Sequence, residues 1–217
     1  METGRFIRMI DEKLHWENIY KTKSSKEVSW FKSHLEKSLE LILKLNLSKD
    51  VQIMDIGGGA STLPDDLLAK GFKNITVLDI SSEALKVSQN RLGSKQSQIR
   101  WLEADITKTF LESNRYDLWH DRAVFHFLTD LSDRKKYVAQ LKHSLKPNSH
   151  VIISTFSLKG PLKCSGLEIV RYSPETLRAE LGKEFKLVES QEEEHSTPFG
   201  TTQAFIYCHF KKVVARQ

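Results

Sequence analysis

The chain has 217 residues, of which 39% are hydrophobic and 28% charged, and its formal net charge is +5. A chain of this length and composition can bury a core of its own, which excludes dominant disorder and a small disulfide scaffold. Cys164 and Cys208 are too few for a disulfide framework or a four-thiolate zinc site, and no apolar run reaches the roughly 20 residues of a membrane span. We therefore expect one domain over residues 1–217, working in the cytoplasm with reduced thiols. The basic residues are scattered along the chain, which argues against a nucleic-acid partner.

Strand-like and helix-like runs alternate along most of the chain. A helix-like run comes first, at 29–45. The strand-like runs that follow lie at 51–56, 74–80, 98–104, 116–120 and 150–156, and the helix-like runs between and after them lie at 63–70, 83–92, 134–145 and 174–181. Two further strand-like runs, 185–191 and 202–210, follow each other directly. The alternation predicts a Rossmann-like, doubly wound α/β sheet that is mostly parallel, and the last two runs predict a C-terminal antiparallel hairpin.

A glycine cluster, Gly57-Gly58-Gly59, follows the first strand at the end where a parallel sheet forms its binding crevice. The dinucleotide fingerprint G-x-G-x-x-G is not completed, because Thr62 stands at its third glycine position. An acidic residue, Asp55, lies two residues before the cluster. These departures disfavour a nicotinamide enzyme.

Two more acidic residues follow the next two strands. Asp79 ends the second strand, 20 residues after Gly59, where its carboxylate could accept hydrogen bonds from both hydroxyls of a ribose. Asp105 follows the third strand, where it could accept from an adenine amino group with Ile106 beside the ring. Each acid by itself could equally be a helix cap or a loop charge, but their shared position at strand ends predicts a nucleoside-binding crevice.

These segments resemble the motifs of class I S-adenosylmethionine-dependent methyltransferases. The segments are Asp55-Ile56-Gly57-Gly58-Gly59-Ala60-Ser61, Val77-Leu78-Asp79-Ile80-Ser81, Ala104-Asp105-Ile106, Tyr116-Asp117-Leu118-Trp119-His120-Asp121 and Leu145-Lys146-Pro147-Asn148-Ser149. Ser61 stands where the family more often has a third glycine. The resemblance implies the seven-stranded fold of that family over residues 50–213 and S-adenosyl-L-methionine as cofactor. No metal is expected, because no His/Cys/Asp spacing suggests a complete ligand set, although a catechol-type magnesium mechanism stays an alternative. The resemblance also implies a cofactor-binding role for Asp55, Gly57, Gly58, Gly59, Asp79, Ile80, Asp105 and Ile106.

A narrower resemblance concerns two other segments. Asp121-Arg122-Ala123 and His15-Trp16-Glu17-Asn18-Ile19-Tyr20 are similar to stretches of thiopurine-type and protein-lysine methyltransferases, although Ala123 stands where those groups have glycine. The resemblance implies that residues 1–47 form an N-terminal helical lid and that Trp16 and Tyr20 contact the cofactor. The alternative is that these two rings are ordinary core anchors.

Three residues at or just after the end of the fourth strand-like run are candidates for catalysis. Asp121 and His120 end that strand beside the expected methyl group, and His126 follows close by. Asp121 could instead pair with Arg122 or cap the helix expected after it, and His126 could be a packed helix histidine between two phenylalanines. The Asn/Asp-Pro-Pro-aromatic motif of nucleic-acid base methyltransferases is missing from this stretch.

The sequence therefore predicts an enzyme that transfers a methyl group from S-adenosylmethionine to a small-molecule acceptor. A protein lysine methyltransferase and a non-catalytic S-adenosylmethionine-binding module are the alternatives, and a nicotinamide oxidoreductase is a weaker one. The acceptor is not specified by any residue pattern in the chain, because this fold serves many substrates.

Overall fold

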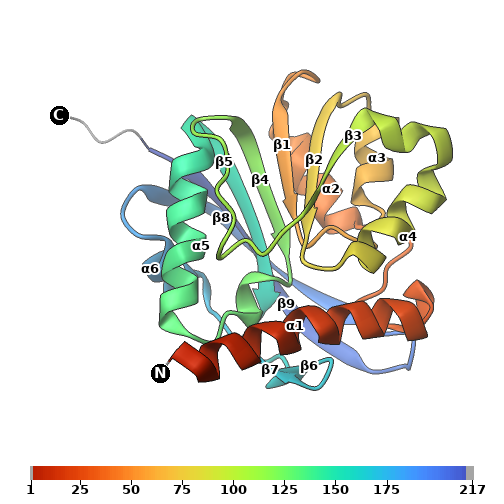
Figure 1. Cartoon of the computed structure of the whole chain (residues 1–217). Coiled ribbons are helices and arrows are strands. Elements are labelled where there is room, and N and C mark those ends of the chain that lie inside the picture. Colours follow the sequence, from red (N-terminus) through yellow and green to blue (C-terminus); the bar gives the residue numbers. More distant parts are fainter. Residues whose placement is uncertain (1, 214–217) are drawn as a thin grey trace.

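A seven-stranded mixed sheet forms the centre of the computed structural model, which describes residues 2–213 and, of residues 2–11 and 25, the backbone alone. The strand order is β3-β2-β1-β4-β5-β9-β8 (Figure 1). The strands are β1 (Gln52–Ile56), β2 (Asn74–Asp79), β3 (Ile99–Glu103), β4 (Tyr116–Arg122), β5 (Leu145–Phe156), β8 (Phe185–Ser196) and β9 (Thr202–Lys212). Strands β1 to β5 pair in parallel, whereas β9 is antiparallel to both β5 and β8. The predicted fold class and its C-terminal hairpin are confirmed.

Helices cover both faces of this sheet because successive side chains of a strand point to opposite faces. Along β1, Ile53 packs in one buried cluster and Met54 in the other. The first cluster includes side chains of α2 (Glu36–Lys44), α3 (Leu63–Ala69) and α4 (Ser82–Leu92). The second includes side chains of α5 (Leu131–Ser144) and α6 (Pro174–Leu181). The central parallel strands β1, β2 and β4 are therefore buried on both sides, as their nearly continuous apolar runs predict, whereas the edge strand β3 is partly exposed.

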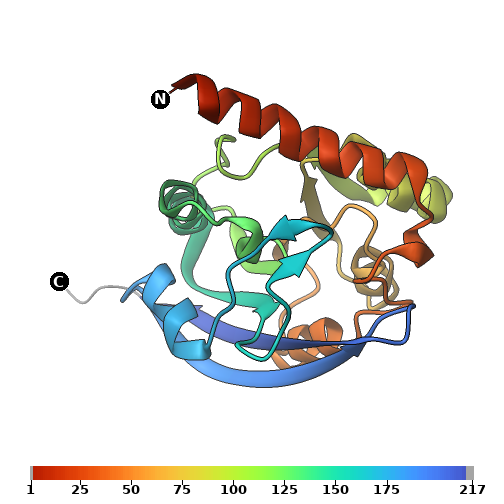
Figure 2. The same cartoon turned by 90° about the horizontal axis from the view of Figure 1, so that it is seen from below.

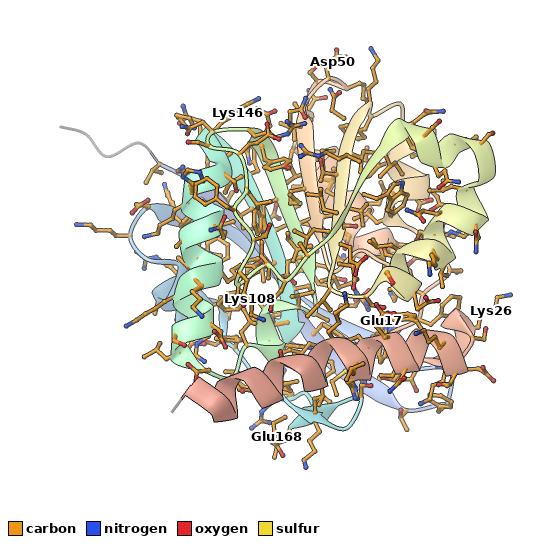
Figure 3. The ribbon with its side chains drawn as sticks, viewed as in Figure 1. Glu17, Lys26, Asp50, Lys108, Lys146 and Glu168 are labelled. Carbon is orange, nitrogen blue, oxygen red and sulfur yellow. The ribbon has the colours of Figure 1, made fainter. Side chains whose placement is uncertain are left out.

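Two elements lie across the carboxyl ends of the parallel strands. The long helix α1 (Glu2–Thr22) crosses this end of the sheet, and the small hairpin of β6 (Lys163–Cys164) and β7 (Leu167–Glu168) lies beside it (Figures 1 and 2). Glu17 and Glu168 mark this end, whereas Asp50 and Lys146 lie at the opposite end of the sheet (Figure 3). The region predicted for ligand binding is thus covered by two separate segments.

The hairpin was not among the predicted elements. Its two-residue turn, Ser165-Gly166, has positive φ at both positions, 52° and 80°. This backbone conformation matches the tight turn that joins twisted antiparallel strands, and a Ser-Gly pair is a recognised turn signal. The strands have only two residues each, too few for periodicity to reveal them.

The predicted helix over 29–45 is wrong in its first part, because α2 begins only at Glu36. The preceding segment is held by tertiary hydrogen bonds from the core. His195 Nε2 donates to the carbonyl oxygen of Ser29 at 2.7 Å, and Arg122 Nη1 donates to that of Trp30 at 3.1 Å. The carbonyl oxygens of Ser29 and Trp30 therefore accept from β8 and β4 and not from a following turn of helix. These tertiary contacts outweigh the helical spacing of the apolar residues.

Within residues 2–213, no helix combines the length and the apolar character that crossing a membrane requires.

Candidate active site

A cavity of about 480 Å³ lies at the carboxyl ends of the strands, beneath α1 and the β6–β7 hairpin. Seven of the residues predicted to bind cofactor line it: Trp16, Tyr20, Gly57, Asp79, Ile80, Asp105 and Ile106. A smaller cavity of about 60 Å³ is lined by the predicted residues Tyr20, Asp55, Gly57, Gly58 and His120. Gly59, Asp121 and His126 line neither cavity. The fold therefore brings segments from residue 16 to residue 106 to one site.

The glycine turn after β1 leaves no room for a side chain. Gly57 has a φ of +66°, and a Cβ there would lie 2.1 Å from Cγ2 of Val124. A Cβ on Gly59 would lie 2.6 Å from Oδ2 of Asp79. The backbone N–H of Gly59 donates to the same oxygen at 3.0 Å, so the turn and the acid at the end of β2 hold each other in place.

Asp79 forms part of the wall of the larger cavity and is 8% exposed. Its Oδ2 accepts from Gly59, and its Oδ1 accepts from the backbone N–H of Ser81 at 2.9 Å. Burial raises the pKa of Asp79 to about 6, against the opposing effect of these two hydrogen bonds. Each carboxylate oxygen can accept a second hydrogen bond. A narrow glycine turn beside an acid with spare acceptor capacity fits the ribose and methionine parts of S-adenosylmethionine.

Asp105 lies farther along the same cavity but is engaged by its own turn. Its Oδ1 accepts from the backbone and the hydroxyl of Thr107 at 2.8 and 2.7 Å, and its Oδ2 pairs with Lys108. Burial would raise the pKa of Asp105, but the bonds from Lys108 and Thr107 outweigh it and hold the pKa below its usual value. Its part in binding an adenine amino group stays a prediction. Ile106, which is buried, lines the cavity beside it.

Asp121 holds a turn instead of facing either cavity. It is fully buried, and its Oδ1 accepts from the backbone N–H of Val124 at 2.9 Å. Its Oδ2 accepts from the N–H of Phe125 at 3.1 Å and from the hydroxyl of Tyr137 at 2.6 Å. Burial raises its pKa to about 6, although the Tyr137 hydroxyl acts in the opposite direction. These contacts favour the alternative in which Asp121 caps the segment after β4.

Asp121→Asn tests this alternative directly. An amide cannot accept on both sides, so one of the buried donors at Val124, Phe125 or Tyr137 loses its partner. We expect the free energy of unfolding to fall by about 1–3 kcal/mol, with turnover per folded molecule nearly unchanged. The measurements are thermal melting and methyl transfer with an identified acceptor. A normal melting temperature with turnover lowered about 100-fold would instead support the predicted catalytic role.

His126 and His120 are both buried, in different surroundings. His126 packs against Phe127 and Phe156, and its Nδ1 accepts from the backbone N–H of Phe156 at 3.3 Å. Burial lowers its pKa to about 3, so the ring is neutral at physiological pH. His120 lies between Asp55 and Ser38 on the wall of the smaller cavity. The structure thus separates the three residues predicted for catalysis.

Trp16 and Tyr20 face the cavity from α1, four residues apart on one side of the helix. Trp16 packs edge to face against Trp30 and Phe127, with ring centroids 5.6 and 5.1 Å apart. The hydroxyl of Tyr20 accepts from Nε1 of Trp30 at 3.3 Å, and burial raises the pKa of Tyr20 well above its usual value. The two rings are thus both packed and cavity-lining, which leaves cofactor contact a prediction.

Glu17 attaches helix α1 to the start of α4 by hydrogen bonds. This buried carboxylate accepts from the backbone N–H of Ser82 at 2.8 Å, from its hydroxyl at 3.1 Å and from the N–H of Glu83 at 3.3 Å. Although desolvation opposes them, the bonds from Ser82 and Glu83 keep the pKa of Glu17 below its usual value. The carboxylate therefore acts as a cap for the N-terminus of α4, where negative charge is favoured.

Glu17→Ala is expected to loosen α1 without unfolding the sheet. The variant leaves the N–H groups at the start of α4 without their carboxylate, which costs about 1–3 kcal/mol. Amide hydrogen exchange over residues 2–22 should accelerate, and S-adenosylhomocysteine should bind more weakly. Lys13→Ala is the matched control, because its ion pair with Glu103 is nearly half exposed and such pairs contribute about 0–1 kcal/mol. Equal exchange in the two variants would contradict the role of Glu17.

Sequence reasoning assigned no site role to several residues that line the larger cavity. They are Trp30, Arg122, Val124, Phe127 and the hairpin residues Lys163, Cys164 and Glu168. Arg122 belongs to a segment that was recognised, but nothing in a single sequence distinguishes a cavity-lining arginine from a solvated one. The hairpin reaches the site only through the tertiary fold.

Residues 54–153 match a family described as "Methyltransferase domain". EEF1A lysine methyltransferase 2 of Danio rerio is 27% identical over 159 residues, which cover 66% of this chain and 67% of that protein. Malonyl-[acyl-carrier protein] O-methyltransferase 2 of Ilyobacter polytropus is 27% identical over 198 residues, which cover 85% of this chain and 74% of that protein. These two relatives act on different kinds of acceptor by name, so they do not decide between the predicted substrate classes.

Solved structures share the fold over most of the chain. A S-adenosylmethionine-dependent methyltransferase from Anabaena variabilis superposes with a TM-score of 0.70, 14% identity, and coverage of 92% of this chain and 94% of the other. The 1,6-didemethyltoxoflavin-N1-methyltransferase of Burkholderia thailandensis was solved with 1,6-didemethyltoxoflavin and S-adenosylhomocysteine. It superposes with a TM-score of 0.66 and 18% identity, over 98% of this chain and 90% of the other. At these identities the likeness establishes the fold.

Proposed function

We infer, since this chain belongs to the class I S-adenosylmethionine-dependent methyltransferases, that it methylates a small-molecule acceptor held beneath α1 and the β6–β7 hairpin. S-Adenosylmethionine is its cofactor and supplies an electrophilic methyl group on a sulfonium. The proposal takes residues 1–217 as one methyltransferase domain, with residues 1–47 as the lid. A cytoplasmic location stays a prediction.

The observation that carries this proposal is the covered, aromatic part of the larger cavity. Beyond Asp79 the cavity wall includes Trp16, Trp30 and Phe127. His15 Nε2 of α1 lies 3.4 Å from the Ser165 hydroxyl of the hairpin, so the two covering segments meet over the site. The volume of about 480 Å³ is in the range of small-ligand sites, about 300–1,000 Å³, and includes the part of the cavity assigned to the cofactor. A chamber closed from two sides favours a small acceptor over an extended protein surface.

The residues of this chamber suit a methyl transfer in two ways. Aromatic faces attract a cation and exclude water, which favours the charged sulfonium and protects the reacting groups. The packed rings also restrict how an acceptor can lie, and positioning supplies most of the rate enhancement in an in-line displacement. For an acceptor that arrives protonated, His15 is an imidazole on the cavity wall that could take the proton.

A protein lysine side chain is the second candidate acceptor. The similarity to EEF1A lysine methyltransferase 2 favours it. A lysine side chain is long and narrow enough to enter a chamber that a folded protein surface cannot.

The test is methyl transfer from S-adenosylmethionine labelled in its methyl group. The full-length protein is incubated in parallel with a protein-free metabolite fraction and with a protein fraction depleted of small molecules. We expect label in the metabolite fraction, and far less of it when Asp79→Ala replaces the wild type at a subsaturating cofactor concentration. Label in protein alone would replace the first candidate by the second. Cofactor binding without any transfer would favour the non-catalytic binding module.

A further inference from the structure

Arg122 lines both cavities, and no carboxylate of the described residues forms a salt bridge with it. The other two described basic side chains of the lysine or arginine type on a cavity wall, Lys32 and Lys163, are paired. Lys32 lies 2.5 Å from Glu193 and Lys163 lies 2.8 Å from Glu168. Because a charge that is shielded from water is costly without a partner, the Arg122 guanidinium points to an anionic ligand.

The protein groups around this guanidinium orient it without neutralising its charge. Its Nε donates to the hydroxyl of Tyr207 at 3.0 Å, its Nη1 donates to the carbonyl oxygen of Trp30 at 3.1 Å, and the group lies over the ring of Phe205, 4.9 Å from the centroid. Burial raises the pKa of Cys164 to about 12, although the Arg122 charge acts in the opposite direction, so this thiol is neutral too. The remaining nitrogen, Nη2, is buried and has no hydrogen-bond partner. A ligand can therefore take Nη2 without further loss of side-chain freedom.

Arg122 lies on the side of the larger cavity that the nucleoside-binding candidates leave free. Asp79 ends β2 and Asp105 follows β3, and both strands lie on one side of β1 in the sheet. Arg122 ends β4 on the other side of β1, and its partners Tyr207 and Phe205 belong to β9, two strands farther out. The guanidinium therefore faces the part of the cavity that is available to an acceptor.

The charge of the site favours a carboxylate over a phosphate group. A phosphate monoester carries about −1.5 to −2 at pH 7, which exceeds the single positive charge of Arg122. A carboxylate carries one negative charge, and its two oxygens match the planar guanidinium. Trp16, Trp30 and Phe127 line the same cavity, so an apolar body attached to the carboxylate would meet aromatic rings.

We propose that the methyl acceptor is a small carboxylate whose anionic group binds Nη2 of Arg122. Its apolar body lies against the aromatic rings of the larger cavity. The inference rests on the proposed function, because it names the class of the small-molecule acceptor. Arg122 is then a substrate-binding residue: it anchors one end of the acceptor and thereby restricts how the acceptor can approach the methyl group.

Calorimetry on the protein saturated with S-adenosylhomocysteine tests for the carboxylate. The probes are benzoate, phenylacetate and cinnamate, and each is compared with its uncharged amide, which has nearly the same shape. We expect at least one acid to bind about 10-fold or more tightly than its amide, the scale of a hydrogen bond to a charged group. The proposal is wrong if no acid is preferred, or if phenyl phosphate binds more tightly than all three acids.

Arg122→Met tests whether this residue produces the preference. In the variant, each acid should bind within about 3-fold of its amide, and the affinity for S-adenosylhomocysteine should stay within about 3-fold of wild type. A preference that survives would overturn the proposal. A loss of about 10-fold or more for S-adenosylhomocysteine would also overturn it, because Nη2 would then serve the cofactor. Arg122→Gln, which keeps an amide donor for the Trp30 carbonyl, replaces the methionine variant if that variant does not fold.

His195→Leu controls for the second effect of Arg122, which also anchors the segment before α2. His195 donates to the neighbouring Ser29 carbonyl but lines neither cavity. This variant should keep the preference for the acid over its amide. If the preference is lost here as it is in Arg122→Met, the segment and not the Arg122 charge produces it, and the proposal is overturned.

Methyl transfer separates the failure of this proposal from that of the proposed function. The metabolite fraction is divided on a strong anion exchanger at about pH 11, where amines are largely neutral and carboxylates stay charged. Label should enter the retained part, and far less of it with Arg122→Met when that part is supplied at a subsaturating concentration. Label in the unretained part alone would overturn the carboxylate acceptor and leave small-molecule methylation standing. Label in protein alone would overturn the proposed function, and this proposal with it.

Discussion

Gly57→Val is expected to abolish binding of S-adenosylmethionine. Valine disfavours the φ of +66° at this position, and its Cβ would lie 2.1 Å from Cγ2 of Val124. The turn or Val124 would have to shift, and because Gly57 lines both cavities, the shift would alter the walls of both. Calorimetry should detect no binding at ligand concentrations about 100-fold above the wild-type dissociation constant. By contrast, Asp105→Ala should bind measurably, because the carboxylate is engaged with Thr107 and Lys108.

Gly71→Val separates loss of the site from general backbone strain. Gly71 also has a positive φ, +85°, but the nearest atom to an added Cβ is Cγ of Lys49 at 4.0 Å. It lines neither cavity. This variant should therefore lower the melting temperature while the remaining folded protein binds cofactor normally. The prediction for Gly57 fails if the two variants bind equally well, or if Asp105→Ala is the more damaging change.

Asp79→Ala is expected to weaken cofactor binding at least 10-fold. The variant removes the acceptor for the ribose hydroxyls, and each hydrogen bond to a charged group contributes about 1.5–3 kcal/mol. It also removes the partner of the Gly59 N–H and thereby frees the glycine turn. Asp79→Asn keeps one carbonyl oxygen, so its affinity for the cofactor should lie between those of Asp79→Ala and the wild type. Calorimetry beside a melting curve checks this, and unchanged binding by a normally folded Asp79→Ala would contradict the assignment.

The raised pKa of Asp79 predicts how binding depends on pH. Because burial raises this pKa to about 6, the carboxylate is charged at pH 7.5 and mostly protonated near pH 5. Protonation removes acceptor capacity, so the dissociation constant should rise about 10-fold as pH falls from about 7 to 5. The Asp79→Ala variant should lack this dependence. The stability of the free protein should change with pH in the opposite direction. Because the pKa of Asp79 is higher in the folded than in the unfolded chain, protonated Asp79 adds to the free energy of unfolding at low pH, and this addition is lost as pH rises through about 6.

The order and type of the main elements could be predicted from the sequence because both depend on local patterns. The alternation of strand-like and helix-like runs predicted the parallel sheet. In the structure, Ser81 and Ser173 accept hydrogen bonds at the starts of α4 and α6. The placement of Asp79 beside the glycine turn follows from the same logic. In a parallel sheet the carboxyl ends of neighbouring strands meet at one edge, so acids at these ends share a crevice.

Other features depended on contacts between residues far apart in the chain. The segment over 29–35 has helical apolar spacing, but bonds from His195 and Arg122, more than 90 residues away, hold its carbonyls outside a helix. Asp121 and Asp79 both end strands and share a pKa of about 6, yet Tyr137 and a following turn enclose only Asp121. The sequence predicts which residues lie at the end of each strand. Whether such a side chain faces the cavity depends on the residues that pack over that strand end. The sequence by itself therefore predicted the sheet, the family and the edge that carries the candidate site, and only the tertiary structure decided which side chains at that edge line a cavity.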